Sequence, residues 1–290
     1  MRKLKVGIIG SGNIGCDLLM KIARSPYLEC TLFMGRNLDS KGMRFAYRQG
    51  VNVTDKSIHE LEANPDLCDI VFDATTASAH LVHATILKRL GKFAIDLTPS
   101  LVGKMCVPTV NGEECLSCDN VNMITCGGQA TVPIAHALSK VVGSPQYVEI
   151  VASISSNSAG PGTRANIDEF TQTTKQALLD FTGAQSAKAI IILNPAQPPI
   201  MMHNTIYMVC PEPSKKDIVA AVRAVRDKMR EYMPGYSITK GPVYIDGKIV
   251  VMVQLEGRGD YLPRYSGNLD VITASAVRIA EMHAQRRAAP

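Results

Sequence analysis

The first 24 residues constrain the fold of this chain more than any other stretch. LKVGIIG, residues 4–10, is a continuous apolar run of the kind that forms a strand buried on both faces. After the short stretch SGNIG, the apolar residues of CDLLMKIAR recur at helical spacing. Gly10, Gly12 and Gly15 stand at this junction in a G-x-G-x-x-G pattern. The sequence therefore predicts a strand, a tight glycine turn and a helix, in that order.

The same alternation continues through the first half of the chain. CTLFMG (30–35), DIVFDAT (69–75) and KFAIDLT (92–98) are typical of further buried strands, and residues 79–90 have the pattern of a helix between the last two. Strands that alternate with helices form a doubly wound parallel sheet. We therefore predict an α/β fold of Rossmann type.

The length of the chain predicts two domains. A chain of 290 residues, of which 46% are hydrophobic, can bury more than one core. We expect a dinucleotide-binding domain in residues 1–125, completed by a C-terminal helix in residues 269–290. A second α/β domain for catalysis and dimerisation is expected in residues 126–268. The active site should then lie in the crevice between the domains.

Composition excludes several classes of function. The net charge of +5 is spread along the chain without runs of like charge, and tryptophan is absent, so a nucleic-acid partner is not indicated. No stretch has the roughly 20 apolar residues of a membrane span, and the N-terminal run is too short for a signal peptide. Eight scattered cysteines favour a reducing compartment over a disulfide framework. We expect a cytoplasmic protein without a metal site, in which the Cys115/Cys118 pair is incidental and His80 and His83 are ordinary helix residues.

The glycine pattern predicts a dinucleotide site, with a purely structural turn as the alternative. The helix N-terminus supplies N–H donors for a pyrophosphate, and Gly12 lets the backbone approach it. The acidic residue that usually contacts the ribose about 20 residues further on is missing, since this position has Arg36 and Asn37. Asn37 can bond a hydroxyl without repelling a phosphate, and Arg36 can pair with a 2′-phosphate. We favour NAD and leave NADP open.

Cys126, in NMITCGGQAT, is the candidate nucleophile. It stands just ahead of a predicted helix whose first turn would contain Pro133. A helix N-terminus lowers a thiol pKa, and the two following glycines leave room for a substrate carbonyl and expose N–H donors. A buried thiol at a tight turn is an equally good interpretation of these features. Beside a nicotinamide, a reactive cysteine would form a hemithioacetal with an aldehyde and then a thioester, which water, phosphate or a thiol resolves.

Several long motifs carry a family resemblance. SGNIG, DLTPS, NMITCGGQAT, SAGPGTRANIDEFTQTT, NPAQPP and YLPRYSGNLD, in this order, resemble the acylating acetaldehyde dehydrogenases. These enzymes depend on coenzyme A and work with 4-hydroxy-2-oxovalerate aldolase in the degradation of aromatic compounds. The resemblance implies that Cys126 forms the acyl thioester, that the substrates are a short aldehyde, NAD and coenzyme A, and that the chain forms a homodimer.

The resemblance also implies further site residues. Those implied to contact the cofactor are Ser11, Gly12, Asn13, Ile14, Asn157, Ser158, Ala159, Gly160, Pro161, Gly162, Thr163, Arg164, Ala165 and Asn268, and those implied to line the acyl pocket are Asn166, Ile167 and Ile191. The glycine-rich loop precedes a capping-box-like helix start, residues 166–169, so its N–H groups and Arg164 suit an anion, although a plain surface loop has the same composition. Asn268 resembles an N-cap of the last helix.

Two departures from the family pattern affect these inferences. Asn204 stands where the family has an aspartate that is thought to activate the cysteine or the incoming thiol, and an amide cannot accept a proton. Either His203 is the base, or the helix dipole suffices, or activity is weakened; a surface role for His203 is favoured. Residues 236–255 also lack a segment of roughly two dozen residues, which weakens the aldolase assignment. A phosphate-dependent semialdehyde-type dehydrogenase and an idle dinucleotide-binding subunit remain as alternatives.

Overall fold

The computed structural model describes residues 3–160, 164 and 167–288. The chain divides into two compact units, residues 1–123 with 273–290, and residues 124–272. Helix α10 (Gly267–Ala288) begins in the second unit and continues through the end of the first. No helix in the described part of the chain is long and apolar enough to cross a membrane.

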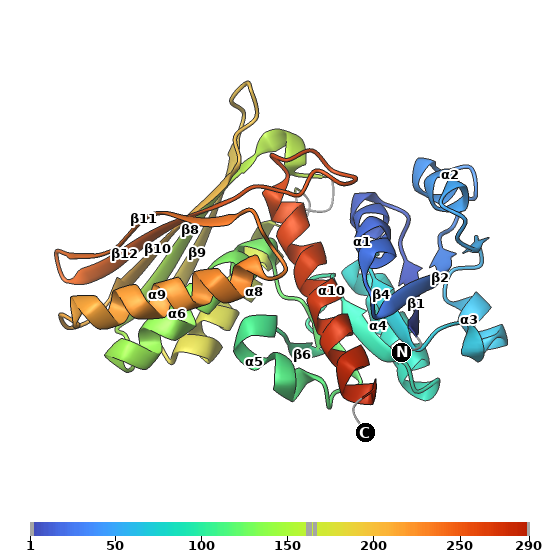
Figure 1. Cartoon of the computed structure of the whole chain (residues 1–290), viewed down its shortest axis with the longest axis horizontal. Helices are drawn as coiled ribbons and strands as arrows, with labels where there is room; N and C mark the ends of the chain where they lie inside the picture. Colours follow the sequence, from blue (N-terminus) through green and yellow to red (C-terminus); the bar gives the residue numbers. More distant parts are fainter. Residues whose placement is uncertain (1–2, 161–163, 165–166, 289–290) are drawn as a thin grey trace. The chain divides into compact units, whose positions relative to one another are not determined.

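The first unit is a parallel sheet with helices (Figure 1). Its strands lie in the order β3-β2-β1-β4-β5-β7-β6, and every paired neighbour is parallel. The strands are β1 (Leu4–Ile9), β2 (Leu28–Met34), β3 (Val53–Thr54), β4 (Ile70–Asp73), β5 (Phe93–Asp96), β6 (Lys104–Met105) and β7 (Asn120–Asn122). The helices are α1 (Asn13–Arg24), α2 (Lys41–Arg48), α3 (His59–Ala63), α4 (Ala77–Arg89) and α5 (Pro108–Cys115), with a 3₁₀ turn at Pro65–Leu67.

The apolar runs of the sequence are the central strands of this sheet. Ile8 of β1, Phe72 of β4 and Ile95 of β5 are fully buried, as expected for strands covered on both faces. Chain order β1-α1-β2 and the reversal from β1 to β4 give the doubly wound topology. The predicted fold class is confirmed, and the carboxyl ends of β1, β2 and β4 form the edge at which such sheets bind ligands.

The second unit is a mixed five-stranded sheet in the order β11-β12-β10-β8-β9. Its elements are α6 (Cys126–Val142), β8 (Tyr147–Ser155), a 3₁₀ turn (Ser156–Ser158), α8 (Ile167–Thr182), β9 (Ser186–Asn194), β10 (Met202–Val209), α9 (Lys215–Arg230), β11 (Tyr236–Ile245) and β12 (Lys248–Leu255). Within this sheet, β8 and β9 pair in parallel, and the other described pairs are antiparallel. Figure 1 shows α6, α8 and α9 together on one face of the sheet.

Alternating burial distinguishes the two faces of this sheet. Ile249, Val251 and Val253 of β12 are fully buried, whereas Val250 and Met252 between them are only partly buried. This period of two means that the helices cover one face and that the other face lacks a cover within the described chain. The sheet therefore presents a second face that carries apolar side chains.

Candidate active site

The glycine turn between β1 and α1 has the geometry of a pyrophosphate cradle. Gly10 has φ of +114°, and a Cβ there would stand 2.5 Å from the carbonyl oxygen of Ala74. A Cβ at Gly15 would stand 1.9 Å from the carbonyl oxygen of Gly10, so α1 begins in direct backbone contact with the turn. At Gly12 a Cβ would meet nothing within 4 Å. Two glycines are thus required by packing, and the third faces open space.

The start of α1 suits an anion. Gly12 is the N-cap, and no side chain in the described part of the chain caps this end. The first N–H groups of a helix have no partner within the helix and carry partial positive charge. Ser11 and Gly12 form the turn, and Asn13 and Ile14 are the first residues of the helix. These residues fit a dinucleotide pyrophosphate, and their contact with one stays a prediction.

Cys126 is the first residue of α6, one position further into the helix than predicted. Its N-cap is Thr125, whose hydroxyl accepts a hydrogen bond from Gly128 N–H at 2.9 Å. The Thr125 hydroxyl also lies 2.6 Å from that of Thr174 in α8, which in turn donates to the carbonyl oxygen of Phe170 at 2.7 Å. A chain of hydrogen bonds therefore fixes the start of α6 to α8.

The prediction for Pro133 is wrong. Proline was expected in the first turn, but Pro133 is the eighth residue of the continuous helix α6. An interior proline removes one backbone hydrogen bond and costs about 3 kcal/mol in an isolated helix. Here Val132, Pro133 and Ile134 are all buried in the unit. Tertiary packing therefore outweighs the local preference.

The glycines after Cys126 serve packing and do not leave the empty space that the sequence suggested. A Cβ at Gly127 would stand 2.7 Å from Cζ of Phe170 and 3.5 Å from Cδ1 of Ile150. A Cβ at Gly128 would stand 2.6 Å from Cδ1 of Ile124. Ile124 itself has φ of +50°, an uncommon conformation for a β-branched residue. The turn before α6 is thus held in a strained form by close contacts.

The pKa of Cys126 differs from the sequence-based expectation. Burial raises the pKa of the thiol to about 12, although hydrogen bonds from the N–H groups of Gly127 and of Cys126 itself to the sulfur act to lower it. The expected effect of the helix start is therefore present, but desolvation by the packed surroundings is larger. The sulfur of the chain alone is a thiol at neutral pH.

Asn204 lies on the helix-covered face of the second sheet. In β10 it is paired with Ala152 of β8 on one side and with Val253 of β12 on the other. Its side chain is 1% exposed, and neither its Nδ2 nor its Oδ1 has a hydrogen-bond partner among the described residues. Buried amides are nearly always hydrogen-bonded, and leaving one unpaired costs about 1–3 kcal/mol per group. A side chain of this kind is a candidate for contact with a ligand.

The register of the sheet aligns Asn204 with other candidates. Ile191 of β9 pairs with Ala152, so Ile191, Ala152 and Asn204 form one row across three strands. Ile150, two residues before Ala152 on the same face, reaches α6 at Gly127. The structure thus brings the predicted pocket residue Ile191 and Asn204 to the face that carries the start of α6. Ile167, the other described pocket candidate, is the first residue of α8 and is half-buried.

His203 lies on the other side of the sheet. It precedes Asn204 in β10 and is exposed, whereas Asn204 is buried. Successive side chains of a strand point to opposite faces. His203 is therefore not placed as a base on the face that carries Asn204, in agreement with the favoured surface role.

Arg164, in the glycine-rich segment before α8, bonds back to the residues that begin this segment. Arg164 donates from Nε to the carbonyl oxygen of Ala159 at 3.1 Å, and from Nη2 to the carbonyl and hydroxyl oxygens of Ser156 at 2.8 and 2.9 Å. Asn157 is exposed, Ser158 is buried, and a Cβ at Gly160 would meet nothing within 4 Å. Arg164 thus holds the backbone at Ser156 and Ala159 as well as presenting a cation. Pro161, Gly162, Thr163, Ala165 and Asn166 lie outside the described residues.

Asn268 is joined to this loop. The prediction that it is the N-cap is wrong, because α10 begins at Gly267 and Asn268 is the second residue of the helix. The side chain is 1% exposed, its Nδ2 donates to the carbonyl oxygen of Ser158 at 3.4 Å, and its Oδ1 has no partner among the described residues. The structure therefore brings together two cofactor candidates that are 110 positions apart in sequence.

Sequence reasoning missed a buried ionic network in the first unit. His80 and His83 of α4 both donate from Nδ1 to Oδ2 of Asp73, at 2.8 and 2.7 Å. His80 Nε2 lies 3.6 Å from Oδ2 of Asp96 and 2.9 Å from the side chain of Asn120. Asp73 and Asp96 end β4 and β5, and carboxylates at the ends of two parallel strands were the signal that could have identified this network. Among the described residues, no group of three or more histidine, cysteine, aspartate or glutamate side chains could hold a metal ion.

Two family models match the chain. Residues 5–117 match a model described as the NAD-binding domain of semialdehyde dehydrogenases. Residues 126–263 match a model described as prokaryotic acetaldehyde dehydrogenase, dimerisation. The two matched regions fall largely within the first and second units, respectively.

The curated relatives are similar over almost their whole length. Acetaldehyde dehydrogenase of Brevibacillus brevis is 53% identical over 288 residues, which cover 98% of this chain and 97% of the relative. Acetaldehyde dehydrogenase of Pectobacterium atrosepticum is 50% identical over 283 residues, with coverage of 97% and 96%. Neither alignment leaves room for an additional segment of roughly two dozen residues, so the expected difference in length is wrong for these relatives.

Solved structures show a likeness in fold. Aspartate semialdehyde dehydrogenase II of Vibrio cholerae, complexed with ASA, and aspartate semialdehyde dehydrogenase of Candida albicans, with NADP, each superpose with a TM-score of 0.67 and 14% identity. Each match covers 97% of this chain and 98% of the solved chain. At this identity the likeness extends to the fold and not to the substrate.

Proposed function

Because the chain belongs to the acetaldehyde dehydrogenase family, we propose that it converts acetaldehyde to an acyl thioester on Cys126 and transfers the acyl group to coenzyme A. The observation that carries this proposal is the position of the Cys126 sulfur at the start of α6, hydrogen-bonded by two backbone N–H groups. The face that carries this helix start also holds Ile191 and the unpaired amide of Asn204.

The reaction has two halves. The sulfur of Cys126 loses its proton and forms a bond to the carbonyl carbon of the aldehyde, and the carbonyl oxygen becomes an oxyanion. NAD, when bound, supplies the acceptor for the hydride that leaves this carbon. The resulting thioester is attacked by the thiolate of coenzyme A, and Cys126 leaves as the thiolate and regains its proton. The N–H groups of Cys126 and Gly127 can donate to the oxyanion once they release the sulfur, whereas the N–H of Gly128 stays bonded to the Thr125 hydroxyl.

Asn204 has a defined role in this proposal. Its amide can donate to the substrate oxygen and accept from a thiol, but it cannot take the proton of Cys126 or of coenzyme A. Its two unpaired heteroatoms are satisfied when a polar ligand enters the site. We therefore assign Asn204 to substrate positioning, while solvent or the substrate accepts the proton.

The proposed experiment is NADH formation from acetaldehyde and NAD, with and without coenzyme A. Steady turnover with coenzyme A, at most one equivalent of NADH without it, and loss of both in Cys126→Ala are expected. Cys118→Ala, at a partly exposed thiol of the first unit, is the matched control and should retain activity. Turnover that requires phosphate in place of coenzyme A would indicate a semialdehyde-type enzyme. Nucleotide binding without any NADH burst would indicate an idle subunit.

A homodimer is part of the proposal, since the matched family model is a dimerisation domain. We assign the interface to the uncovered face of the second sheet, where Tyr207 and Val250 pair with each other and Ile192 is 44% exposed. Thr205→Arg, at a partly buried position of this face, should give monomers in light scattering after size exclusion, and Lys228→Ala on α9 should not. Unchanged dimers in Thr205→Arg would contradict this assignment.

The cellular setting is also proposed. All eight cysteines are free thiols, which supports a reducing compartment and hence the cytoplasm. An aldolase that cleaves 4-hydroxy-2-oxovalerate is the proposed source of the aldehyde, on the strength of the family resemblance. Co-purification of the untagged chain with a tagged aldolase from the same cells tests this partnership, and independent elution of the two would contradict it.

A further inference from the structure

The turn after β2 lacks the carboxylate of an NAD-specific site. Nucleotide-binding domains of this fold place an aspartate or glutamate at the end of the second strand, where it accepts both ribose hydroxyls. Here Met34 ends β2, and Gly35, Arg36 and Asn37 follow. Arg36 and Asn37 are both exposed. The first carboxylate in the turn is that of Asp39, five residues after the end of the strand.

This turn is in direct contact with the glycine turn of β1 and α1. The hydroxyl oxygens of Ser11 and Ser40 are 3.4 Å apart. A Cβ at Gly35 would stand 3.3 Å from Oγ of Ser11, and one at Gly42 would stand 1.9 Å from the carbonyl oxygen of Ser11. The start of α2 is therefore fixed against the pyrophosphate cradle. An adenosine ribose bound beside that cradle lies over the residues that follow β2.

A hydrogen bond within the turn leaves the amide nitrogen of Asn37 as a donor for a ligand. Asp39 donates its backbone N–H to Oδ1 of Asn37 at 2.8 Å, so the oxygen of this amide is used within the turn. The amide nitrogen of Asn37, a donor only, is left for a ligand. An aspartate would present oxygen atoms and negative charge at this position, whereas the asparagine presents N–H groups. This arrangement favours an anion over a hydroxyl pair.

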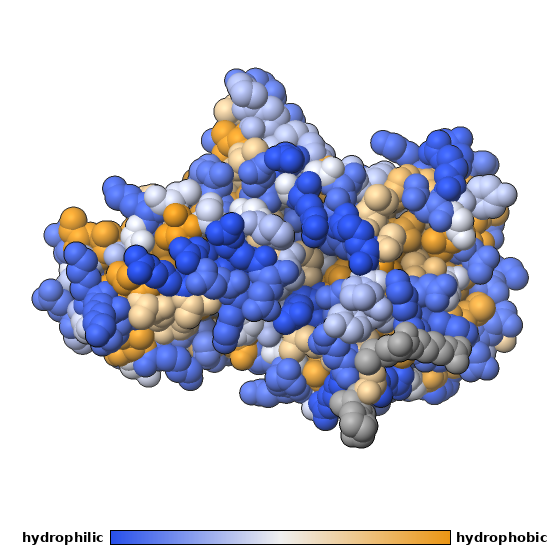
Figure 2. Space-filling view, in the orientation of Figure 1, coloured by the Kyte–Doolittle hydropathy of each residue, from blue (hydrophilic) through white to orange (hydrophobic). Residues whose placement is uncertain are grey.

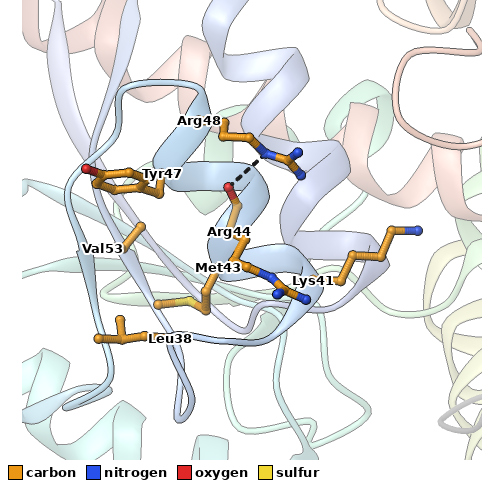
Figure 3. Close-up of a pocket in the computed structure, with 7 residues that line it drawn as sticks. All are labelled: Leu38, Lys41, Met43, Arg44, Tyr47, Arg48 and Val53. Carbon is orange, nitrogen blue, oxygen red and sulfur yellow. Dashed lines mark hydrogen bonds between the residues drawn. The ribbon is translucent and has the colours of Figure 1, made fainter.

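Three cations surround the turn. Arg36, Lys41 and Arg44 are exposed, and none of them forms an ion pair with a carboxylate in the described part of the chain. Figure 3 shows Lys41 and Arg44 on one side of α2, at the rim of a pocket of about 640 Å³, with Tyr47 and Val53 on its other side. Figure 2 shows hydrophilic side chains beside hydrophobic ones at the place that α2 has in Figure 1. Arg36, Lys41 and Arg44 thus place positive charge on the turn and on the start of α2, with Asp39 as the carboxylate between them.

We propose that this turn binds the 2′-phosphate of NADP, with Arg36 as the principal contact and Lys41 and Arg44 as supporting charges, so that the chain accepts NADP as well as NAD. A guanidinium can hold a phosphate through two parallel hydrogen bonds, which a lysine cannot do. The inference rests on the proposed function in that it takes the first unit as the nucleotide-binding unit.

Calorimetric titration with 2′,5′-ADP and with 5′-AMP tests the proposal directly, because these ligands differ only in the 2′-phosphate. The unaltered chain should bind 2′,5′-ADP more tightly, and Arg36→Leu should reduce that affinity roughly 10- to 100-fold while leaving 5′-AMP unchanged, as expected for loss of a charge-assisted contact. Asn37→Asp should weaken the binding of 2′,5′-ADP and strengthen the binding of 5′-AMP, because the new carboxylate can accept from the ribose hydroxyls and repels the 2′-phosphate.

Arg48→Leu is the matched control, because Arg48 is the last residue of α2, at the end opposite Lys41, and its Nε donates to the carbonyl oxygen of Arg44 at 3.3 Å. An equal loss of affinity for 2′,5′-ADP in Arg48→Leu and Arg36→Leu would overturn the proposal, because it would show general electrostatic attraction only. Equal affinities for 2′,5′-ADP and 5′-AMP in the unaltered chain would also overturn it. NAD binding without preference for the 2′-phosphate refutes this inference alone, whereas absence of NAD binding refutes the proposed function.

Discussion

Replacement of Thr125 by valine should loosen the start of α6 without changing the shape of the side chain. The threonine hydroxyl accepts from Gly128 N–H at 2.9 Å and contacts the Thr174 hydroxyl at 2.6 Å, and Thr125 is 6% exposed. Valine fills the same volume but offers no acceptor, so the buried N–H of Gly128 loses its partner. Thr174 keeps its bond to the carbonyl oxygen of Phe170.

The expected magnitude follows from these contacts. Loss of a side-chain N-cap costs about 0.5–2 kcal/mol, and an unpaired buried donor costs about 1–3 kcal/mol. These two figures describe the same lost bond, so we expect the free energy of unfolding to fall by about 2 kcal/mol in Thr125→Val. Thr125→Ser retains the acceptor and loses one methyl group, so its loss should be below about 1 kcal/mol.

Urea unfolding followed by circular dichroism measures the loss, and hydrogen exchange at the Gly128 amide locates it. Exchange at Gly128 should accelerate in Thr125→Val and stay close to the unaltered chain in Thr125→Ser. The reasoning would be refuted by equal stability of Thr125→Val and the unaltered chain, or by equal losses in the valine and serine variants. Either result would mean that the cap does not hold the helix start.

Three further predictions follow from burial and charge. Alkylation of Cys126 by iodoacetamide, with Cys126→Ser as the blank, should rise about tenfold per pH unit from pH 7 to 10 because its pKa is raised to about 12; a plateau below pH 9 would contradict this. Burial raises the pKa of Asp73, but hydrogen bonds from His80 and His83 outweigh burial and hold this pKa below its ordinary value. Burial lowers the pKa of His80, but the interactions with Asp73 and Asp96 outweigh burial and hold this pKa above its ordinary value. The contribution of Asp73 to the free energy of unfolding is present above about pH 4 and is lost towards lower pH. The contribution of His80 is complete below about pH 6.5 and is lost as the pH rises through the pKa that His80 has in the folded chain. Stability measured against pH should therefore decline on both sides of this window, and Asp73→Asn should flatten both declines. Tyr236→Phe should lower the free energy of unfolding by about 1 kcal/mol through loss of the 2.8 Å bond to the carbonyl oxygen of Ala130, and an unchanged midpoint in urea would contradict it.

The first unit was predictable because its signals are local. A buried strand, the three glycines and an amphipathic helix follow one another within 24 residues, and Gly10 and Gly15 each have a steric reason that depends on neighbouring backbone. The apolar runs at 69–75 and 92–98 became β4 and β5 for the same reason. Short-range patterns of this kind determine which residues form strands and which form helices.

The pKa of Cys126 and the position of Pro133 were not predictable because they depend on contacts from distant segments. The start of α6 is desolvated by Phe170 of α8 and Ile150 of β8, which no local pattern associates with residue 126. The row of Ile191, Ala152 and Asn204 likewise depends on strand register, which the sequence leaves open until the sheet is assembled. Family resemblance supplied Ile191 and Asn204 as candidates, and strand register supplied their alignment through Ala152.

The described surroundings of Cys126 are uncharged, and this has a chemical consequence. Thr125, Thr174, Phe170 and Asn204 hold the helix start or lie on its face of the sheet, and none of them carries a charge or accepts a proton at neutral pH. Burial in such surroundings keeps the sulfur protonated in the chain alone. Under the proposed function, ligands that enter the site therefore have to promote loss of the proton from the sulfur. It follows that the pH dependence of alkylation in the free chain and that of turnover should differ, because turnover is measured with ligands present that alter the solvation of the sulfur.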